Sequence, residues 1–150
     1  MNSPGFRVFL AAQVYCHSDS LFMNGMEVRD LLLIAGDIHH IFPRAYLKKQ
    51  GIDNRARYNQ VANYIYLDTQ VNKAIGDQAP CEYFGKVIQQ CETKAPVLGN
   101  VVDTELLKRN LDENCIPQAI HQMDFTNYEE FLSQRRYLMA AKIKEYYGNL

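Results

Sequence analysis

The chain has 150 residues, of which 47% are hydrophobic and 22% are charged, and this composition excludes a disordered protein. No apolar run approaches the ~18 residues that a membrane-spanning helix needs, and the first residues have neither the charged region nor the apolar core of a signal peptide. From the length and these absences we expect one compact cytoplasmic domain with no membrane contact. The four cysteines form no C-x-x-C pair, so we expect reduced thiols and no cysteine zinc cage.

The formal net charge of −1 conceals an excess of positive charge in the middle of the chain. Residues 41–73 carry six basic and two acidic side chains, whereas acidic side chains outnumber basic ones on both sides of this stretch. Such a stretch attracts phosphate groups even when the whole chain is nearly neutral, but a solvated loop would have the same composition. Its basic residues are Arg44, Lys48, Lys49, Arg55, Arg57 and Lys73.

The first part of the chain is predicted to be mostly helical. Phe6–Tyr15 has apolar residues at helical spacing, and a loop is expected to follow at Ser18–Gly25. A second helix is expected over Met26–Ala35, where Gly36 would stop it.

Shorter elements are predicted in the middle. Asp37–Pro43 is too short for a helix and ends at proline, and a helical turn is expected over Ala45–Lys49, before a polar loop. Asn63–Leu67 has the β-branched and aromatic content of a strand. Thr69 would cap a short helix that ends at Gly76.

Helices are again predicted in the last part of the chain. One would cover Pro80–Cys91, and the stretch 93–102 would link it to a second over 104–114. A capping box at 126–129 would open the final helix, over 128–147. The apolar residues of that helix are expected to form a packing stripe or, as the alternative, a partner-binding face. They are Phe131, Tyr137, Leu138, Ala141, Ile143 and Tyr146.

Two adjacent histidines stand between Asp37 and Pro43, in the order D-I-H-H-I-F-P. In an extended backbone alternate side chains share a face, so Asp37 and His39 would point together and His40 would point elsewhere. A carboxylate and an imidazole on one face could bind a metal ion, which would leave His40 free to act as a base. A purely structural role for both rings is the alternative.

Two asparagines follow at fixed distances from this pair. Asn63 lies 23 residues after His40, and Asn72 lies nine residues after Asn63. Asparagine is a poor helix former, and no capping role explains it at Asn72. A residue with low helix propensity inside a helix is expected where a functional role matters more than helix stability.

Segments 37–43 and 63–73 together resemble the HNH, or ββα-metal (His-Me finger), endonuclease motif. The family pattern is roughly D-H-I-x-P, then N-L-x-x-L, with a His or Asn nine positions after that Asn. By this resemblance His40 takes the place of the invariant His, and Asn63 and Asn72 take the two later positions. His39 replaces the usual Asp, which leaves the preferred metal open, because imidazole suits Mn²⁺, Ni²⁺ or Zn²⁺ better than Mg²⁺.

The resemblance extends over most of the chain. Segments 39–49, 62–68 and 75–84 look like the C-terminal nuclease part of GmrSD-type restriction and phage-defence proteins, which join a ParB-like nucleotidase domain to an HNH nuclease domain. The D-G-Q-Q-R type motif of the ParB-like part is absent from this sequence. The sequence therefore looks like the C-terminal piece of a larger protein, with a ParB-like domain or subunit as a partner, or like a truncated copy of such a protein.

The fold that the resemblance implies is α+β and mostly helical, with one HNH-nuclease-like domain over residues 1–150. Its ββα-metal core, a hairpin plus a helix, would span residues 36–78. Helices at 3–35 and a helical part at 80–150 would flank this core.

The activity that the resemblance implies is hydrolysis of DNA phosphodiester bonds with a divalent metal ion, Mg²⁺ or Mn²⁺, with Ni²⁺ or Zn²⁺ as alternatives. His40 would activate water, and Asn63 would hold the ring or the loop of His40. His39 and Asn72 would bind the metal, with Asp37 as a further ligand. The basic residues of the middle stretch would contact phosphates. RNA cleavage is one alternative, and a degenerate HNH fold that acts as a non-catalytic interaction module is another.

Overall fold

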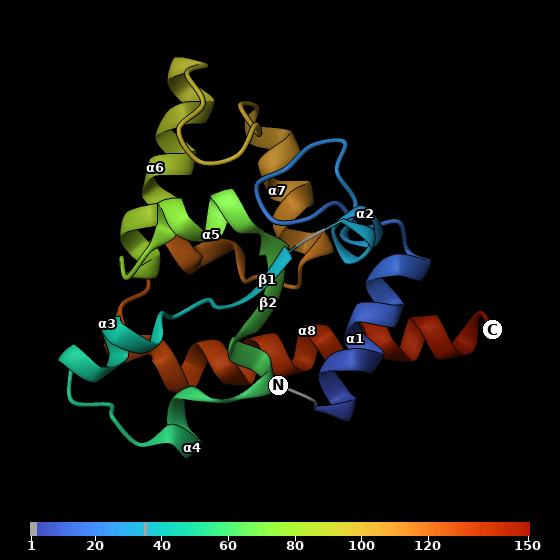
Figure 1. Cartoon of the computed structure of the whole chain (residues 1–150), viewed down its shortest axis with the longest axis horizontal. Coiled ribbons are helices and arrows are strands. Elements are labelled where there is room, and N and C mark those ends of the chain that lie inside the picture. The colour runs from blue at the N-terminus through green and yellow to red at the C-terminus, as the bar shows by residue number, and fades with distance from the viewer. Residues whose placement is uncertain (1–2, 35) are drawn as a thin grey trace.

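The computed structural model describes residues 3–34 and 36–150, and a small antiparallel sheet lies among its helices (Figure 1). Strand β1 (Gly36–His40) pairs with strand β2 (Tyr64–Asp68), so that Gly36 lies opposite Asp68 and His40 lies opposite Tyr64. Within the described ranges these two strands make up the sheet, and helices make up most of the remaining chain. The predicted fold class, α+β and mostly helical, is confirmed.

Helices precede, connect and follow the two strands. The α-helices are α1 (Pro4–Tyr15), α2 (Val28–Leu33), α3 (Arg44–Lys49), α4 (Arg55–Tyr58), α5 (Thr69–Ile75), α6 (Pro80–Thr93), α7 (Thr104–Glu113) and α8 (Tyr128–Gly148). Short 3-10 turns lie at η1 (Val61–Asn63), η2 (Gln118–Gln122) and η3 (Phe125–Asn127). No helix in the described part of the chain is long and apolar enough to cross a membrane.

Strand β2 continues directly into α5, and α5 packs against both strands (Figure 1). Oδ1 of Asp68 accepts hydrogen bonds from the backbone N–H groups of Gln70, at 2.9 Å, and Val71, at 3.1 Å. Asp68 therefore caps the helix, as aspartate commonly does, and the predicted cap at Thr69 is wrong. Gly76 ends α5 with a φ of +58°, a conformation that glycine adopts without strain.

The second predicted helix is shorter than expected. The backbone N–H of Glu27 donates to Oδ2 of Asp30 at 2.9 Å, and this capping box starts α2 at Val28. Gly36, predicted to stop that helix, is instead the first residue of β1, and Ala35 lies outside the described residues. The error arises because the apolar run 31–34 has no periodicity that separates a helix end from a strand start.

Two further local predictions are wrong. The loop expected after α3 contains α4, whose N-cap Asn54 accepts a hydrogen bond from the backbone N–H of Ala56 at 2.9 Å. The capping box before the final helix is not at 126–129. It is formed by Asp124 and Asn127, and it encloses η3 rather than opening α8. Side-chain caps thus decide where these short elements begin.

The final helix α8 packs against α1 and η1, and it crosses α1 in Figure 1. Phe131 and Met139 are buried on its inner face. The predicted apolar stripe is wrong at Tyr137, which is 77% exposed, and at Ala141, which is also exposed. The charged residue Arg135 lies between Phe131 and Met139 on this inner face.

The guanidinium of Arg135 is completely buried and hydrogen-bonded to backbone carbonyls. Nη1 donates to the carbonyl oxygens of Ala62, at 2.9 Å, and Tyr64, at 2.5 Å, and Nη2 donates to that of Asn114 at 3.2 Å. Burial lowers the pKa of Arg135 to about 10, so the side chain is still charged at pH 7. Arg135 therefore ties α8 to the residues on both sides of Asn63.

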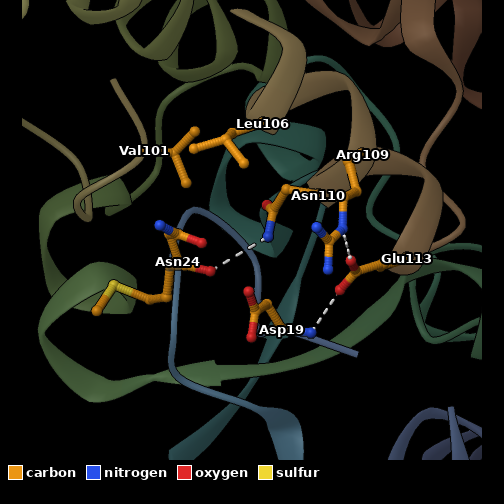
Figure 2. Close-up of a pocket in the computed structure, with 8 residues that line it drawn as sticks. Asp19, Asn24, Val101, Leu106, Arg109, Asn110 and Glu113 are labelled. Atoms are coloured by element: carbon orange, nitrogen blue, oxygen red, sulfur yellow. Dashed lines mark hydrogen bonds and ion pairs between the residues drawn. The ribbon is translucent and has the colours of Figure 1, made fainter. Parts of the chain in front are cut away.

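The loop between α1 and α2 is held against α7 by polar side chains (Figure 2). Oδ1 of Asn110 accepts a hydrogen bond from the backbone N–H of Phe22 at 2.8 Å. Glu113 accepts from the backbone N–H of Asp19 at 2.5 Å and from Nε of Arg109 at 2.8 Å, as Figure 2 shows. The polar side chains between this loop and α7 thus bond to one another and to the backbone of the loop, and they fix the loop in place.

Candidate functional site

The hairpin and α5 bring three of the predicted site residues together. Asp37 and His39 alternate along β1 and so share the face of the strand on which their cross-strand partners, Leu67 and Ile65, lie. Asn72 reaches this face from α5, where its Nδ2 donates to Oδ2 of Asp37 at 3.2 Å. The carboxylate, imidazole and amide that the sequence predicts as metal ligands therefore lie in one neighbourhood.

His39 is held in its neutral form inside this cluster. Its side chain is only 6% exposed, and the ring of Tyr83 lies edge-on with 6.3 Å between ring centres. Burial, together with the nearby charge of His40, lowers the pKa of His39 to about 4, while a polar contact with Asn72 acts in the opposite direction. The buried Nε2 has no hydrogen-bond partner among the described residues, so a nitrogen of a neutral ring is left without a partner.

The pKa of His39 predicts that the metal-free protein loses stability as the pH falls. In the unfolded chain this histidine titrates near ~6.5, whereas in the native protein its pKa is about 4. Below pH 6.5 the unfolded state therefore binds a proton that the native state does not bind until about pH 4. We expect the free energy of unfolding to fall by about 2 kcal/mol between pH 7 and pH 5 from this residue.

Urea unfolding in EDTA at these two pH values measures this effect. His39→Leu carries no titrating group and should remove most of the pH-dependent loss, whatever its own stability at pH 7. Equal pH dependence in His39→Leu and the wild type would contradict the assignment.

His40 ends β1 and lies on the opposite face of the strand from His39. Its Nε2 lies 2.9 Å from Oδ1 of Asn59, and the rings of Tyr58 and Tyr64 are edge-on to it, with centres 6.3 and 5.3 Å away. Burial lowers the pKa of His40, the hydrogen bond to Asn59 opposes this, and the charge of Arg44 lowers it further. The ring is therefore kept neutral by its surroundings.

Asn63 fixes the backbone that follows His40. It is completely buried, and it closes the 3-10 turn η1 rather than opening the strand as predicted, so that β2 begins at Tyr64. Its Oδ1 accepts from the backbone N–H of Phe42 at 2.8 Å, and its Nδ2 donates to the carbonyl oxygens of Phe42, at 3.1 Å, and Tyr58, at 3.2 Å. Of the two roles expected of Asn63, its contacts are those of a residue that holds the loop.

The ring of His40 is instead held by Asn59, which the sequence did not indicate. Asn59 follows α4, and its backbone N–H donates to the carbonyl of Arg55 at 2.9 Å. Nothing in the local pattern singles it out, because α4 has a single turn and the polar stretch around it looks like an ordinary loop. The contact is visible only once the hairpin places His40 beside this loop.

The predicted basic residues differ in their surroundings. Lys49 forms an ion pair with Asp77 at 2.9 Å, Arg57 pairs with Glu129 at 3.3 Å, and the amino group of Lys48 lies over the ring of Tyr58. The other three, which are all exposed, have no ion pair among the described residues. They are Arg44, Arg55 and Lys73. Their charges are available to a phosphate without breaking an existing pair.

The comparisons with known proteins include a distant likeness to an archaeal protein. No family model matches the sequence, and no solved structure matches it. The chain is 26% identical to "Uncharacterized protein MJ0686" of Methanocaldococcus jannaschii, in an alignment of 121 residues that covers 71% of this chain and 20% of that protein. The chain thus corresponds to about a fifth of the length of this archaeal relative.

Proposed function

We propose that this protein hydrolyses DNA phosphodiester bonds with the help of a divalent metal ion, as an HNH-type endonuclease. The observation that carries the proposal is the meeting of Asn72, on the helix after β2, with Asp37 and His39 on one face of β1, while the same strand holds the restrained ring of His40 on its other face. The resemblance to restriction and phage-defence nucleases described above agrees with this arrangement. If the chain acts as part of such a restriction protein, its partner would be a ParB-like domain or subunit.

The chemistry of the cluster fits a divalent cation. Asp37 offers a carboxylate, Asn72 an amide oxygen, and His39 a neutral ring whose buried Nε2 has no hydrogen-bond partner in residues 3–34 and 36–150. Oxygen donors suit Mg²⁺ and Mn²⁺, and an imidazole shifts the preference towards Mn²⁺, Ni²⁺ or Zn²⁺. When bound, such an ion acts as a Lewis acid that neutralises charge on the phosphate and on the departing oxygen.

His40 supplies the general base in this proposal. A neutral imidazole accepts the proton of a water molecule as the oxygen of that water forms a bond to phosphorus and the bond from phosphorus to the 3′ oxygen breaks. Because its surroundings lower its pKa, His40 is unprotonated and ready to accept a proton at pH 7. Asn63 contributes by holding the backbone of Phe42, two residues beyond the base.

The free cations beside the site would hold the nucleic acid. Arg44 lies four residues after His40, and its charge is close enough to lower the pKa of His40. Lys73 is adjacent to Asn72. Contacts of this kind with phosphates give affinity without reading bases. DNA is proposed as the substrate on the resemblance, and RNA is the outcome that a parallel assay distinguishes.

Nicking of supercoiled plasmid tests the proposal. The wild-type protein should convert supercoiled to open-circular DNA with Mn²⁺ or Ni²⁺, less well with Mg²⁺, and not at all with EDTA. An end-labelled RNA incubated in parallel separates DNA from RNA cleavage. If the protein binds Mn²⁺ but cleaves neither substrate with any of these ions or with Zn²⁺, the non-catalytic interaction module replaces the nuclease.

The roles of His39 and Asp37 are separated by metal titration. His39→Asp restores the residue that the family pattern carries, so isothermal titration should show a shift in preference from Mn²⁺ towards Mg²⁺. If His39 only packs against Tyr83 and Asp37 supplies the ligand, Asp37→Asn should abolish binding while His39→Asp leaves the preference unchanged. That second result would remove His39 from the metal site.

A further inference from the structure

The side chain of Asn59 makes a directed contact with the ring of His40. Oδ1 of Asn59 lies 2.9 Å from Nε2 of His40. An amide oxygen can only accept a hydrogen bond, so this contact requires a proton on Nε2. In a neutral imidazole only one nitrogen is protonated, and the other, Nδ1, then carries the lone pair.

Two features hold the ring in this orientation. The rings of Tyr58 and Tyr64 lie edge-on to the imidazole, at interplanar angles of 64° and 87°, and they confine it. Asn59 is anchored through its own backbone N–H, which donates to the carbonyl of Arg55 at 2.9 Å. No described residue forms a hydrogen bond with Nδ1 of His40, so that nitrogen is left for another partner.

We propose that Asn59 is a positioning residue that fixes His40 in the tautomer with the proton on Nε2 and the lone pair on Nδ1. The catalytic part of this inference rests on the proposed nuclease function, in which Nδ1 takes the proton of the attacking water. After that transfer both ring nitrogens carry protons, and the oxygen of Asn59 stabilises the new positive charge through the Nε2–H bond that is already in place. Nε2 itself is never the base, because its lone pair does not exist in this tautomer.

The tautomer is measurable without any cleavage assay. Long-range ¹H–¹⁵N correlation spectra of protein with ¹⁵N-labelled histidine, in EDTA at pH 7.5, distinguish a protonated from an unprotonated ring nitrogen. The chain has four histidines, and His40→Gln identifies the signals of His40 by their loss. We expect a protonated Nε2 and an unprotonated Nδ1 in the wild type. A proton on Nδ1 would overturn the proposal, because Asn59 would then donate through its amide nitrogen.

Variants of Asn59 connect the tautomer to the reaction. Asn59→Leu removes the acceptor and should give a mixture of tautomers and a kcat lower by ~10 to 100-fold, the range known for loss of the group that orients a metal-binding histidine, with KM unchanged. Asn59→Asp keeps an acceptor at the same place and should retain the wild-type tautomer. Gln60→Leu is the matched control on the same loop, because Gln60 bonds to Ala56 and Arg136 rather than to His40.

The possible failures are distinguishable. If Asn59→Leu leaves both the tautomer and kcat unchanged, Asn59 is not a positioning residue. If the tautomer responds as expected but the wild type cleaves no nucleic acid, the nuclease function fails and the assignment of Asn59 to the His40 tautomer stands.

Discussion

His40→Ala is expected to lower DNA cleavage by ~10² to 10⁴-fold, the usual contribution of a general base. The ring of His40 contacts Asn59 and two tyrosines, while the proposed metal cluster lies on the other face of β1. Removing the ring therefore takes away the proton acceptor and leaves Asp37, His39 and Asn72 in place. Binding of Mn²⁺ and of DNA should change little.

Three measurements on the same variant test this separation. Single-turnover nicking rates report the loss of the base, isothermal titration reports metal binding, and fluorescence anisotropy with labelled DNA in EDTA reports nucleic-acid binding. His17→Ala, at an exposed position away from the hairpin, should retain the wild-type rate. Loss of metal binding in His40→Ala would show that the roles of His39 and His40 are exchanged.

Arg135→Met should destabilise the protein by about 3 kcal/mol. Three buried carbonyls, those of Ala62, Tyr64 and Asn114, would lose their donor, and an orphaned buried polar group costs ~1 to 3 kcal/mol. Part of this loss is offset, because the buried guanidinium has no ion-pair partner in the described chain. Replacing it by methionine also removes the free-energy cost of burying that charge. Methionine fills much of the same volume, so a cavity contributes little.

Urea unfolding at pH 7 measures the difference, and the next residue provides the control. Arg136 is exposed, and its one hydrogen bond among the described residues is to Oε1 of Gln60, so Arg136→Met should stay within about 0.5 kcal/mol of the wild type. Arg135→Lys should also be less stable than the wild type, because an ammonium group cannot reproduce the planar fork that spans three carbonyls. Equal stability of Arg135→Met and Arg136→Met would show that these hydrogen bonds do not stabilise the fold.

The separate elements of the hairpin and the helix after it could be predicted because their signals are local or repeat at fixed spacing. The alternation around Asp37 and His39, the β-forming residues at 64–67 and the stop at Gly76 are all read directly from neighbouring residues. The pairing of the two strands and the placing of Asn72 beside Asp37 were instead implied by the resemblance to the HNH motif. The alternation along β1 therefore predicted that Asp37 and His39 share a face, and the resemblance added Asn72 to them.

The contacts that restrain the site could not be predicted in the same way. Asn59 meets His40 and Arg135 meets Tyr64 through tertiary packing, and neither pair is marked by spacing or composition. Arg135 also occupies a buried position of α8, where the helical periodicity predicts an apolar residue. The exposure of Tyr137 has the same origin, because α8 carries charged and apolar residues on several faces and its buried side is set by its neighbours.

The packing of the first helix against the last has a consequence for synthesis on the ribosome. Tyr15 bonds to the carbonyl of Asn149 at 3.1 Å, its ring meets that of Tyr146, and α8 supplies the guanidinium between the carbonyls that flank Asn63. Chains emerge N-terminus first, so the strands and α5 are made while these partners are still missing. A nascent chain would therefore lack the donor for the carbonyls that flank Asn63 until α8 has left the exit tunnel, and the end of the loop before β2 would be the last part of the hairpin to be fixed.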